Sequence, residues 1–352
     1  MTSCFRNNSG GFMSVRKIAL LIALVVVCAA PVSLWAAITL KMATQAPVNS
    51  SWHKALLDLG AEWDAKTSGR VKLTVYAGGT QGSEDATIRM MRPGVDQLQA
   101  NLLMLPGLAA IDDAFNVFGI PFFFQTDAEG QYVLEKLTPM FEKRLDAKGF
   151  KLLCWGSAGW VQLFSKKPLA TLADIKAAKL FTSQGDEEMV QWYKAHGFRP
   201  VALAASDIPA QLKLTTGMID AAPSPPYPAL LLQIFRDAKY MLDVRVAPLY
   251  GAVVVTNEAW NKIDANDRPI VIAAAKTSEK RLLGEAPKLD ADSVATMKAR
   301  GLTVNPLDPK TLASFRTEAE GFVKTMRGNM VPADIFDAAV RERDSFRKTQ
   351  KP

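Results

Sequence analysis

The chain of 352 residues is poor in cysteine and histidine. Of its three cysteines, Cys4 and Cys28 precede residue 38, and its two histidines, His53 and His196, lie far apart. The remaining Cys154 cannot form an internal disulfide by itself, so a large apolar core must supply the stability. The patterns HExxH, CxxC and GxxxxGK[ST] do not occur. These absences argue against zinc proteases, CxxC redox enzymes and P-loop NTPases. We expect no cofactor and no metal ion.

A complete nucleophile elbow is also missing. The nearest match to GxSxG is residues 156–159 around Ser157, which lack the glycine two positions before the serine, and the sole histidine downstream is His196. An elbow of this kind, with a histidine and an acid, would be needed for a secreted α/β hydrolase. The hydrolase is therefore the weaker alternative, and we predict that the chain is not an enzyme.

Long stretches of charge of one sign are absent as well. The formal net charge of +7 falls to +4 when Arg6, Arg16 and Lys17 are removed with residues 1–37. The remaining charges are interspersed, with no basic run before the last dozen residues. This pattern argues against nucleic acid and anionic membranes as partners.

Residues 13–37 have the pattern of a secretory signal. Arg16 and Lys17 precede an apolar run from Ile18 to Ala30, which an exit segment of small residues follows up to Ala37. The apolar run is shorter than the ~20 residues that a membrane span needs. We therefore predict that residues 1–37 are a signal peptide, that the mature chain begins near Ile38, and that the protein is periplasmic.

The first part of the mature chain alternates between strand and helix patterns. Strands are predicted at residues 38–44, 71–76 and 98–105, and helices begin at Ser50 or Ser51 and at Ser83 or Glu84. This β-α-β-α-β order is typical of an α/β domain with a mainly parallel sheet.

The same alternation continues to the C-terminus. A long helix is predicted at 127–148, strands at 150–155 and 160–165, a second βαβα series over 180–235 that includes a helix at 208–216 and a strand at 218–221, a strand at 250–256, and helices from Pro309 and Pro332. Residues 266–300 form one helical stretch in which Pro287 implies a kink or break. Because no linker separates the halves, we expect two interleaved domains between which the chain crosses more than once.

Several short segments, in this order and spacing, resemble the periplasmic solute-binding proteins of tripartite ATP-independent periplasmic (TRAP) transporters. The resemblance extends over nearly all of the mature chain. Its segments are 40–44 (LKMAT), 69–73 (GRVKL), 78–82 (GGTQG), 120–124 (IPFFF), 148–150 (KGF), 165–168 (SKKP), 171–176 (TLADIK) and 214–220 (LTTGMID).

The resemblance implies a two-lobed α/β fold, like that of type II periplasmic solute-binding proteins, with hinge strands and a long helix spanning both lobes. The expected division is residues 38–158 plus about 250–285 for lobe I, and 159–249 plus about 286–352 for lobe II. The function implied is capture of an organic acid by lobe closure and its delivery to TRAP membrane subunits by a monomeric receptor. A periplasmic ligand sensor of the same fold remains an alternative, which the sequence does not distinguish from transport.

Three positions depart from the family pattern. The family usually has an arginine in the strand that reads Lys179 to Thr182 here, and this arginine grips a carboxylate through a bidentate pair. That position is Phe181 in this chain, a second basic position after Trp160 is Val161, and a usual asparagine is Ser224. A small dicarboxylate held by the arginine is therefore not expected; we predict an acid with a sizeable apolar or aromatic body.

Candidate binding residues are those that would follow strands at the cleft, where loops and helix N-termini converge. Several have a structural alternative: Trp52 can be a helix-cap staple, Trp160 a core residue, His53 a surface residue, Asp207 a helix cap and Arg89 a solvated helix charge. The glycine turn around Gly82 can be a turn without a ligand. The predicted substrate-binding residues are Trp52, His53, Gln81, Gly82, Glu84, Arg89, Trp160, Phe181, Ser183, Asp207, Ser224 and Tyr227.

Overall fold

A computed structural model describes residues 1–2, 37–213 and 215–350. The chain divides into two units at residue 37, and the second unit, residues 38–352, contains all the elements considered below. The predicted export signal at 13–37 lies almost entirely outside the described residues. Within the described part, no helix is both long enough and apolar enough to cross a membrane.

The first lobe is built on a five-stranded sheet with the order β2-β1-β3-β10-β4 among the described residues. Strand β1 runs parallel to β2 and β3, as the strand–helix–strand order predicts, whereas β10 runs antiparallel to β3 and β4. The strands are β1 (Ile38–Thr44), β2 (Val71–Tyr76), β3 (Ala100–Met104), β4 (Phe150–Trp160) and β10 (Pro248–Thr256).

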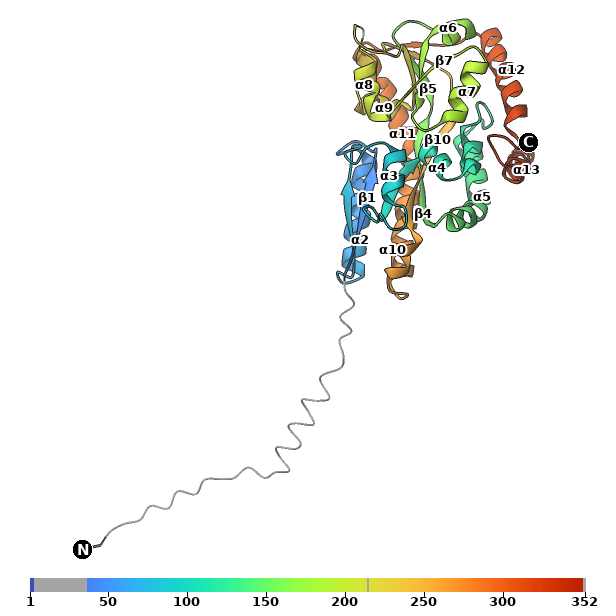
Figure 1. The fold of residues 1–352 in the computed structure, drawn as a ribbon. Coiled ribbons are helices and arrows are strands. Elements are labelled where there is room, and N and C mark those ends of the chain that lie inside the picture. Colours follow the sequence, from blue (N-terminus) through green and yellow to red (C-terminus); the bar gives the residue numbers. More distant parts are fainter. Residues whose placement is uncertain (3–36, 214, 351–352) are drawn as a thin grey trace. The chain divides into compact units, whose positions relative to one another are not determined.

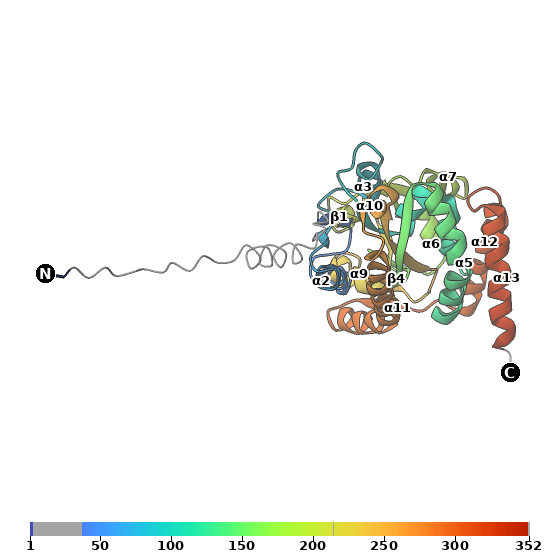
Figure 2. The ribbon, with the colours of Figure 1, turned by 90° about the horizontal axis from the view of Figure 1, so that it is seen from below.

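Helices cover both faces of this sheet (Figures 1 and 2). Strand β10 shows why both faces are apolar: Val253 and Val255 point into one core, whereas Ala252 and Val254 point into the other. One face packs on α2 (Ser51–Lys66), α10 (Asn257–Lys262) and part of α11 (Arg268–Ala299), and the other on α4 (Leu105–Ile111), η1 (Asp113–Gly119), α5 (Asp127–Ala147) and α13 (Ala333–Thr349); the short α3 (Glu84–Met90) packs against α4.

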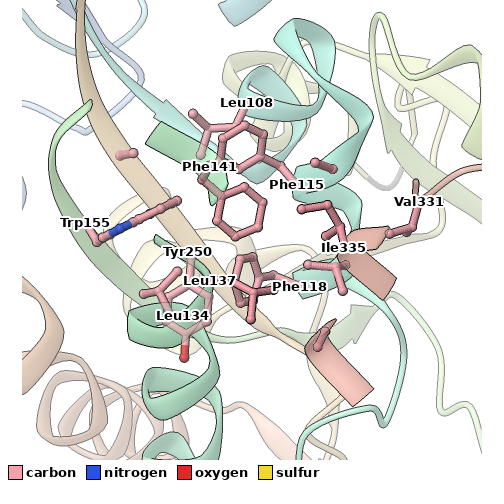
Figure 3. Close-up of a cluster of buried hydrophobic side chains, with 14 of the residues drawn as sticks. Leu108, Phe115, Phe118, Leu134, Leu137, Phe141, Trp155, Tyr250, Val331 and Ile335 are labelled. Carbon is pink, nitrogen blue, oxygen red and sulfur yellow. The ribbon is translucent and has the colours of Figure 1, made fainter. Parts of the chain in front are cut away.

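The second of these cores is rich in aromatic rings. Phe115 of η1 stacks on Phe141 of α5 at 4.7 Å between ring centroids, and Trp155 of β4 lies 5.8 Å from Phe141 (Figure 3). Ile335 of α13 belongs to the same cluster. The predicted division placed residues 286–352 in the second lobe, but α13 packs on α5 and η1, because its apolar face completes this core of the first lobe.

The second lobe is built on a six-stranded sheet with the order β11-β9-β5-β8-β6-β7 in the described part of the chain. Its strands are β5 (Gln162–Ser165), β6 (Lys179–Ser183), β7 (Arg199–Leu203), β8 (Ala221–Ser224), β9 (Tyr240–Leu242) and β11 (Thr303–Asn305). Its helices are α6 (Leu172–Ala177), α7 (Glu187–Ala195), η2 (Ala205–Asp207), α8 (Ile208–Gln211), α9 (Pro226–Leu231), η3 (Ile234–Arg236) and α12 (Pro309–Met326).

Two of the crossings between the sheets run side by side as extended backbone. Only Val161 separates β4 from β5, and its N–H donates to the carbonyl of Ala247 at 2.9 Å while its carbonyl accepts from the N–H of Val246 at 3.0 Å. The returning segment before β10 therefore pairs with the first crossing. These two paired crossings are the hinge strands that the resemblance implies.

Helix α11 reaches both lobes (Figure 1), since Val271 packs in the first lobe's core and Met297 in the second's. Pro287 lies inside the helix, which continues through it without a break. Proline has no N–H to donate to the carbonyl four residues earlier. That carbonyl, of Leu283, instead accepts a hydrogen bond from Gln131 Nε2 at 3.4 Å.

Some predicted elements differ from the structure. The predicted strand 218–221 begins only at Ala221, and the predicted helix 208–216 ends at Gln211. Helix α4 and the 3-10 helix η1 were not predicted, because the sequence between residues 105 and 119 is mostly apolar without a helical period and is interrupted by Asp112 and Asp113. Helix α4 forms part of the site described next.

Candidate functional site

A cavity of about 500 Å³ lies between the lobes. Its walls include residues after β1 and β3 of the first lobe, residues after β6 of the second lobe, and the hinge residues Val161 and Gln162. The carboxyl ends of strands are where α/β folds place their ligands. The side chains on its wall are mostly apolar, among them Phe122, Phe181 and Trp192.

The first-lobe wall is organised around Glu84. Ser83 caps α3 by accepting from the N–H of Ala86 at 3.3 Å, which places Glu84 in the first turn of the helix. The carboxylate accepts hydrogen bonds from the N–H of Met104 at 2.6 Å and from the N–H of Gly107 at 3.0 Å. Glu84 thereby ties α3 to the start of α4. Burial raises the pKa of Glu84 to about 7, against the opposing effect of these two hydrogen bonds.

The second-lobe wall is aromatic. Trp192 of α7 stacks on His196 at 4.1 Å between ring centroids and lies 3.8 Å from the ring of Phe322 of α12. Phe181 of β6 is buried, lines the cavity, and packs also in the core of the second lobe. This wall offers apolar area, and Ser183, at the end of β6, adds a hydroxyl to it.

Tyr227 links the lobes beside the cavity. Its hydroxyl accepts from the N–H of Ser51, in the first turn of α2, at 2.9 Å. Its own N–H donates to Asp290 Oδ1 at 3.1 Å, and Asp290 Oδ2 accepts from the N–H of Trp160 at 3.1 Å. Burial raises the pKa of Asp290 to about 6 although both N–H groups oppose this. Asp290 of α11 therefore holds a second-lobe helix and a hinge strand together.

The lining carries acidic side chains but no lysine, arginine or histidine from the described part of the chain. Asp85 pairs with Arg89, and Glu318 pairs with Lys176 at 2.9 Å. Glu84 accepts only backbone hydrogen bonds. An anionic solute would therefore find no cation on this wall.

Acidic side chains of the two lobes also lie near one another beside the cavity. Burial raises the pKa of both Asp186 and Glu188 near the start of α7, and Asp113 on η1 of the other lobe raises both further. The electrostatic field at the cavity thus adds to the penalty on an anion.

Several buried polar atoms near the cavity lack a hydrogen-bond partner in the described residues. Two belong to lining residues, Gln162 Oε1 and Trp192 Nε1, and two to neighbours of lining residues, Ser51 Oγ and Thr182 Oγ1. Most buried polar groups in folded proteins are hydrogen-bonded. Partnerless atoms gathered here are consistent with a site that a solute completes.

Half of the predicted site residues line this cavity. They are Trp52, Glu84, Phe181, Ser183, Ser224 and Tyr227. Trp52 is also core, because its ring lies so close to Gly156 that a Cβ there would be 2.6 Å from it.

The other six predicted residues lie elsewhere, each for a local reason. His53 Nδ1 accepts from the N–H of Asn49, Gly82 offers its carbonyl to Gln45 Nε2, and Arg89 is exposed beside Asp85. The residues outside the lining are His53, Gln81, Gly82, Arg89, Trp160 and Asp207.

Trp160 and Asp207 have structural positions rather than places in the cavity wall. Trp160 is buried in the aromatic core, where its Nε1 donates to Asp127 Oδ1 at 2.8 Å. Asp207 is exposed at the end of η2. The alternation of a strand does not show which aromatic side chains face a cleft and which face a core.

Sequence reasoning missed Trp192, Gln162 and the 104–107 segment. Trp192 belongs to an amphipathic helix, so it reads as a core residue, and Gln162 follows an aromatic hinge sequence without a motif. The segment from Met104 to Gly107 has no polar side chain. It contributes through its backbone N–H groups, which donate to Glu84, and the residue types do not reveal such a role.

Neither a hydrolase site nor a metal site is formed by the described residues. Ser157 lies within β4 rather than at a strand-to-helix turn, and its Oγ accepts from the N–H of Gly159 at 3.2 Å. His196 Nδ1 lies 2.8 Å from the carbonyl of Trp192. In the described ranges no three His, Cys, Asp or Glu side chains are grouped to hold a metal ion.

Comparison with known proteins gives consistent matches. The family described as "Bacterial extracellular solute-binding protein, family 7" matches residues 42–329. A solute-binding protein of Verminephrobacter eiseniae is 25% identical over 275 residues, which cover 76% of this chain and 78% of that protein. The 2,3-diketo-L-gulonate-binding periplasmic protein YiaO of Escherichia coli is 23% identical over 285 residues, or 79% of this chain and 84% of that protein.

The fold is shared with solved structures. DctP7 of Bordetella pertussis, an extracytoplasmic solute receptor binding pyroglutamic acid, superposes with a TM-score of 0.79 at 21% identity, over 88% of this chain and all of that chain. The family match runs from β1 to the segment before α13 and so includes both lobes and the cavity between them. The chain belongs to the family 7 bacterial extracellular solute-binding proteins.

Proposed function

We propose that this receptor is exported to the periplasm, captures an organic acid with an apolar or aromatic body, and delivers it as a monomer to TRAP membrane subunits without catalysing a reaction. The acid class comes from the relatives, one named for 2,3-diketo-L-gulonate and one described with pyroglutamic acid. The apolar body comes from the cavity of this chain.

The main support for this proposal is that the cavity wall is mostly apolar and, among the described residues, carries no cation. A solute that fills a cavity of about 500 Å³ has most of its surface in contact with side chains such as Phe122, Phe181 and Trp192. Burial of each aromatic or aliphatic side-chain-sized surface contributes ~1.5–3 kcal/mol. A small dicarboxylate has little apolar surface to bury and two charges to desolvate, so the wall disfavours it.

The lobes supply the capture mechanism. Two paired strands and one long helix connect them, and Tyr227 reaches across to Ser51 beside the cavity. A solute that contacts both walls stabilises the closed arrangement relative to the open one by its differential affinity for the two.

The test begins with a thermal-shift panel of dicarboxylates, sugar acids, and aromatic and branched-chain acids, followed by calorimetry on the compounds that stabilise the protein. We expect aromatic or branched acids to stabilise it and succinate and malate not to. Small-angle scattering should then show a smaller radius of gyration with the bound acid. Micromolar binding of succinate, or an unchanged radius at saturation, would contradict the proposal.

A further inference from the structure

We propose that Glu84 holds the carboxyl group of the solute through one shared proton, so that this receptor binds its acid together with a proton from the solvent. The inference rests on the proposed acid class of the solute. In this arrangement the Glu84 carboxyl takes the place of a cation in the cavity, and the receptor's affinity for the acid depends on pH.

The position of Glu84 is fixed by the fold. Its two carboxyl oxygens accept from the N–H groups of Met104 and Gly107 at 2.6 and 3.0 Å, so the carboxyl group cannot swing away from the wall. Each carboxyl oxygen can accept more than one hydrogen bond, and a protonated carboxyl also has one O–H to donate. Glu84 can therefore keep both backbone contacts and still present a proton to the cavity.

In the part of the chain that the structure describes, the lining places no cation beside Glu84 to neutralise its carboxylate. On α3 its neighbour Asp85 is paired with Arg89, and neither β3 nor α4 contains a charged residue. Across the cavity Glu318 is paired with Lys176, and the segment around Gly185 that approaches Asp85 leads to Asp186, another acid. Among the described residues, the charged side chains of the lining are thus acids, and the cations nearest to them, Arg89 and Lys176, are already paired.

Two carboxyl groups brought together under these conditions share a proton. Two adjacent carboxylates in a site of low polarity cannot both stay ionised, and one proton between them removes the repulsion and forms a strong hydrogen bond. Burial has already raised the pKa of Glu84 to about 7, so at neutral pH the proton is readily available. The solute's acid group then needs no arginine.

The main rival is a solute with a positively charged head. An ammonium group facing an ionised Glu84 would also satisfy this wall. The two cases predict opposite responses, because a shared proton is lost as the pH rises whereas an ion pair with an ionised Glu84 is lost as the pH falls.

The experiment uses three probes with one aromatic body: phenylacetate, phenylacetamide and 2-phenylethylamine. Calorimetry from about pH 6 to about pH 8.5, in two buffers with different ionisation heats, measures both affinity and the protons taken up. We expect phenylacetate to bind best, with up to one proton taken up above about pH 7 and an affinity that falls ~tenfold per pH unit there.

Two variants test the residue. Glu84→Gln keeps a hydrogen-bond donor and does not titrate, but its NH2 cannot accept from Met104 or Gly107 as the second carboxyl oxygen does, so one of these two contacts is lost. Whatever the size of that loss, its affinity for phenylacetate should not depend on pH. Asp207→Asn removes an exposed carboxylate that does not line the cavity and should keep the wild-type pH dependence. Thermal unfolding of each variant shows that it is folded.

The outcomes separate this inference from the proposed function. Phenylacetate binding with no proton uptake and no change of pH dependence in Glu84→Gln overturns the role of Glu84 but leaves an acid as the solute. Tighter binding of 2-phenylethylamine, weakened by Glu84→Gln, overturns both. If neither phenylacetate nor any acid of the wider panel binds at any pH tested, the solute is not an organic acid, and both the proposed function and the role of Glu84 are wrong.

Discussion

The hydroxyl oxygen of Tyr227, on the second lobe, lies 2.9 Å from the backbone nitrogen of Ser51, on the first lobe, and accepts its hydrogen. Ser51 is in the first turn of α2, where N–H groups have no partner within the helix. Tyr227 thus satisfies a free donor of the opposite lobe. The contact exists only when the lobes are close together, so it stabilises the closed arrangement.

Tyr227→Phe should therefore weaken solute binding. A single hydrogen bond to a neutral partner contributes ~0.5–1.5 kcal/mol, which corresponds to a loss of affinity of about two- to tenfold. The loss should appear mainly as faster dissociation of the solute, because a less stable closed state opens more often. Stopped-flow fluorescence with an acid identified by the thermal-shift panel measures both rate constants.

Tyr240→Phe is the matched control, because this tyrosine lies on β9 and does not line the cavity. It should leave both rate constants unchanged. If Tyr227→Phe binds and releases the acid at wild-type rates, the hydrogen bond to Ser51 has no part in closure.

A second prediction concerns pH and Asp290. Its pKa is raised by burial to about 6 from an ordinary 3.8, so between about pH 4 and pH 6 the folded protein binds more protons than the unfolded chain. Stability contributed by the protonated group is complete below about pH 4 and is lost as the pH rises to about 6. The free energy of unfolding of Asp290→Asn relative to the wild type should therefore rise over this interval by on the order of 2–3 kcal/mol.

Urea unfolding at several pH values measures this difference. Asp292→Asn is the control on the same helix, since Asp292 is exposed and faces Lys288. Its difference from the wild type should be the same at every pH. A constant difference for Asp290→Asn would mean that Asp290 titrates normally in the folded protein.

The fold was largely predictable from the sequence because its elements are locally consistent. Val71 to Tyr76 alternate as a strand should, and Ser50 and Ser83 cap the helices that follow them. The packing of α13 was not predictable, since its apolar face would fit either lobe. Its contact with α5 depends on which core still has exposed apolar surface after the sheets have formed.

The candidate site was predictable in part, and half of the predicted residues line the cavity. Phe181 and Ser224 were predicted as departures from the pattern that the resemblance implies, and Glu84 and Tyr227 from their places at helix starts; all four line the cavity. Trp160 has the same chemistry as Trp52 but faces the aromatic core, and simple alternation does not predict this: Ala158 and Trp160, two residues apart on β4, lie in opposite cores, since the pairing of β4 with β10 contains register shifts. The direction of a side chain depends on register and on the opposing layer, which single residues do not reveal.

A third prediction concerns the start of the mature chain. The N–H of Ile38 donates to the carbonyl of Arg70 at 2.8 Å, and Ile38 pairs with Val71 at the first position of the β1–β2 ladder. Cleavage well after Ile38 would remove sheet hydrogen bonds, so processing should leave a mature N-terminus within a few residues of it. N-terminal sequencing of the periplasmic fraction measures this. A protein that retains Met13 in the membrane fraction would contradict export by a cleaved signal.

The last prediction concerns Phe181. Phe181→Ala removes an aromatic face from the cavity, and since burying such a face contributes ~1.5–3 kcal/mol, the acid should bind about ten- to a hundredfold more weakly. Phe181 also packs in the second lobe's core, so Phe164→Ala is the matched control: Phe164 is fully buried in the same cluster but does not line the cavity. Both variants should lose ~3–5 kcal/mol of unfolding free energy, but only Phe181→Ala should lose affinity when calorimetry is corrected for the folded fraction. Equal affinity in the two folded variants would show that the solute does not contact the Phe181 ring and that another part of the cavity holds its apolar body.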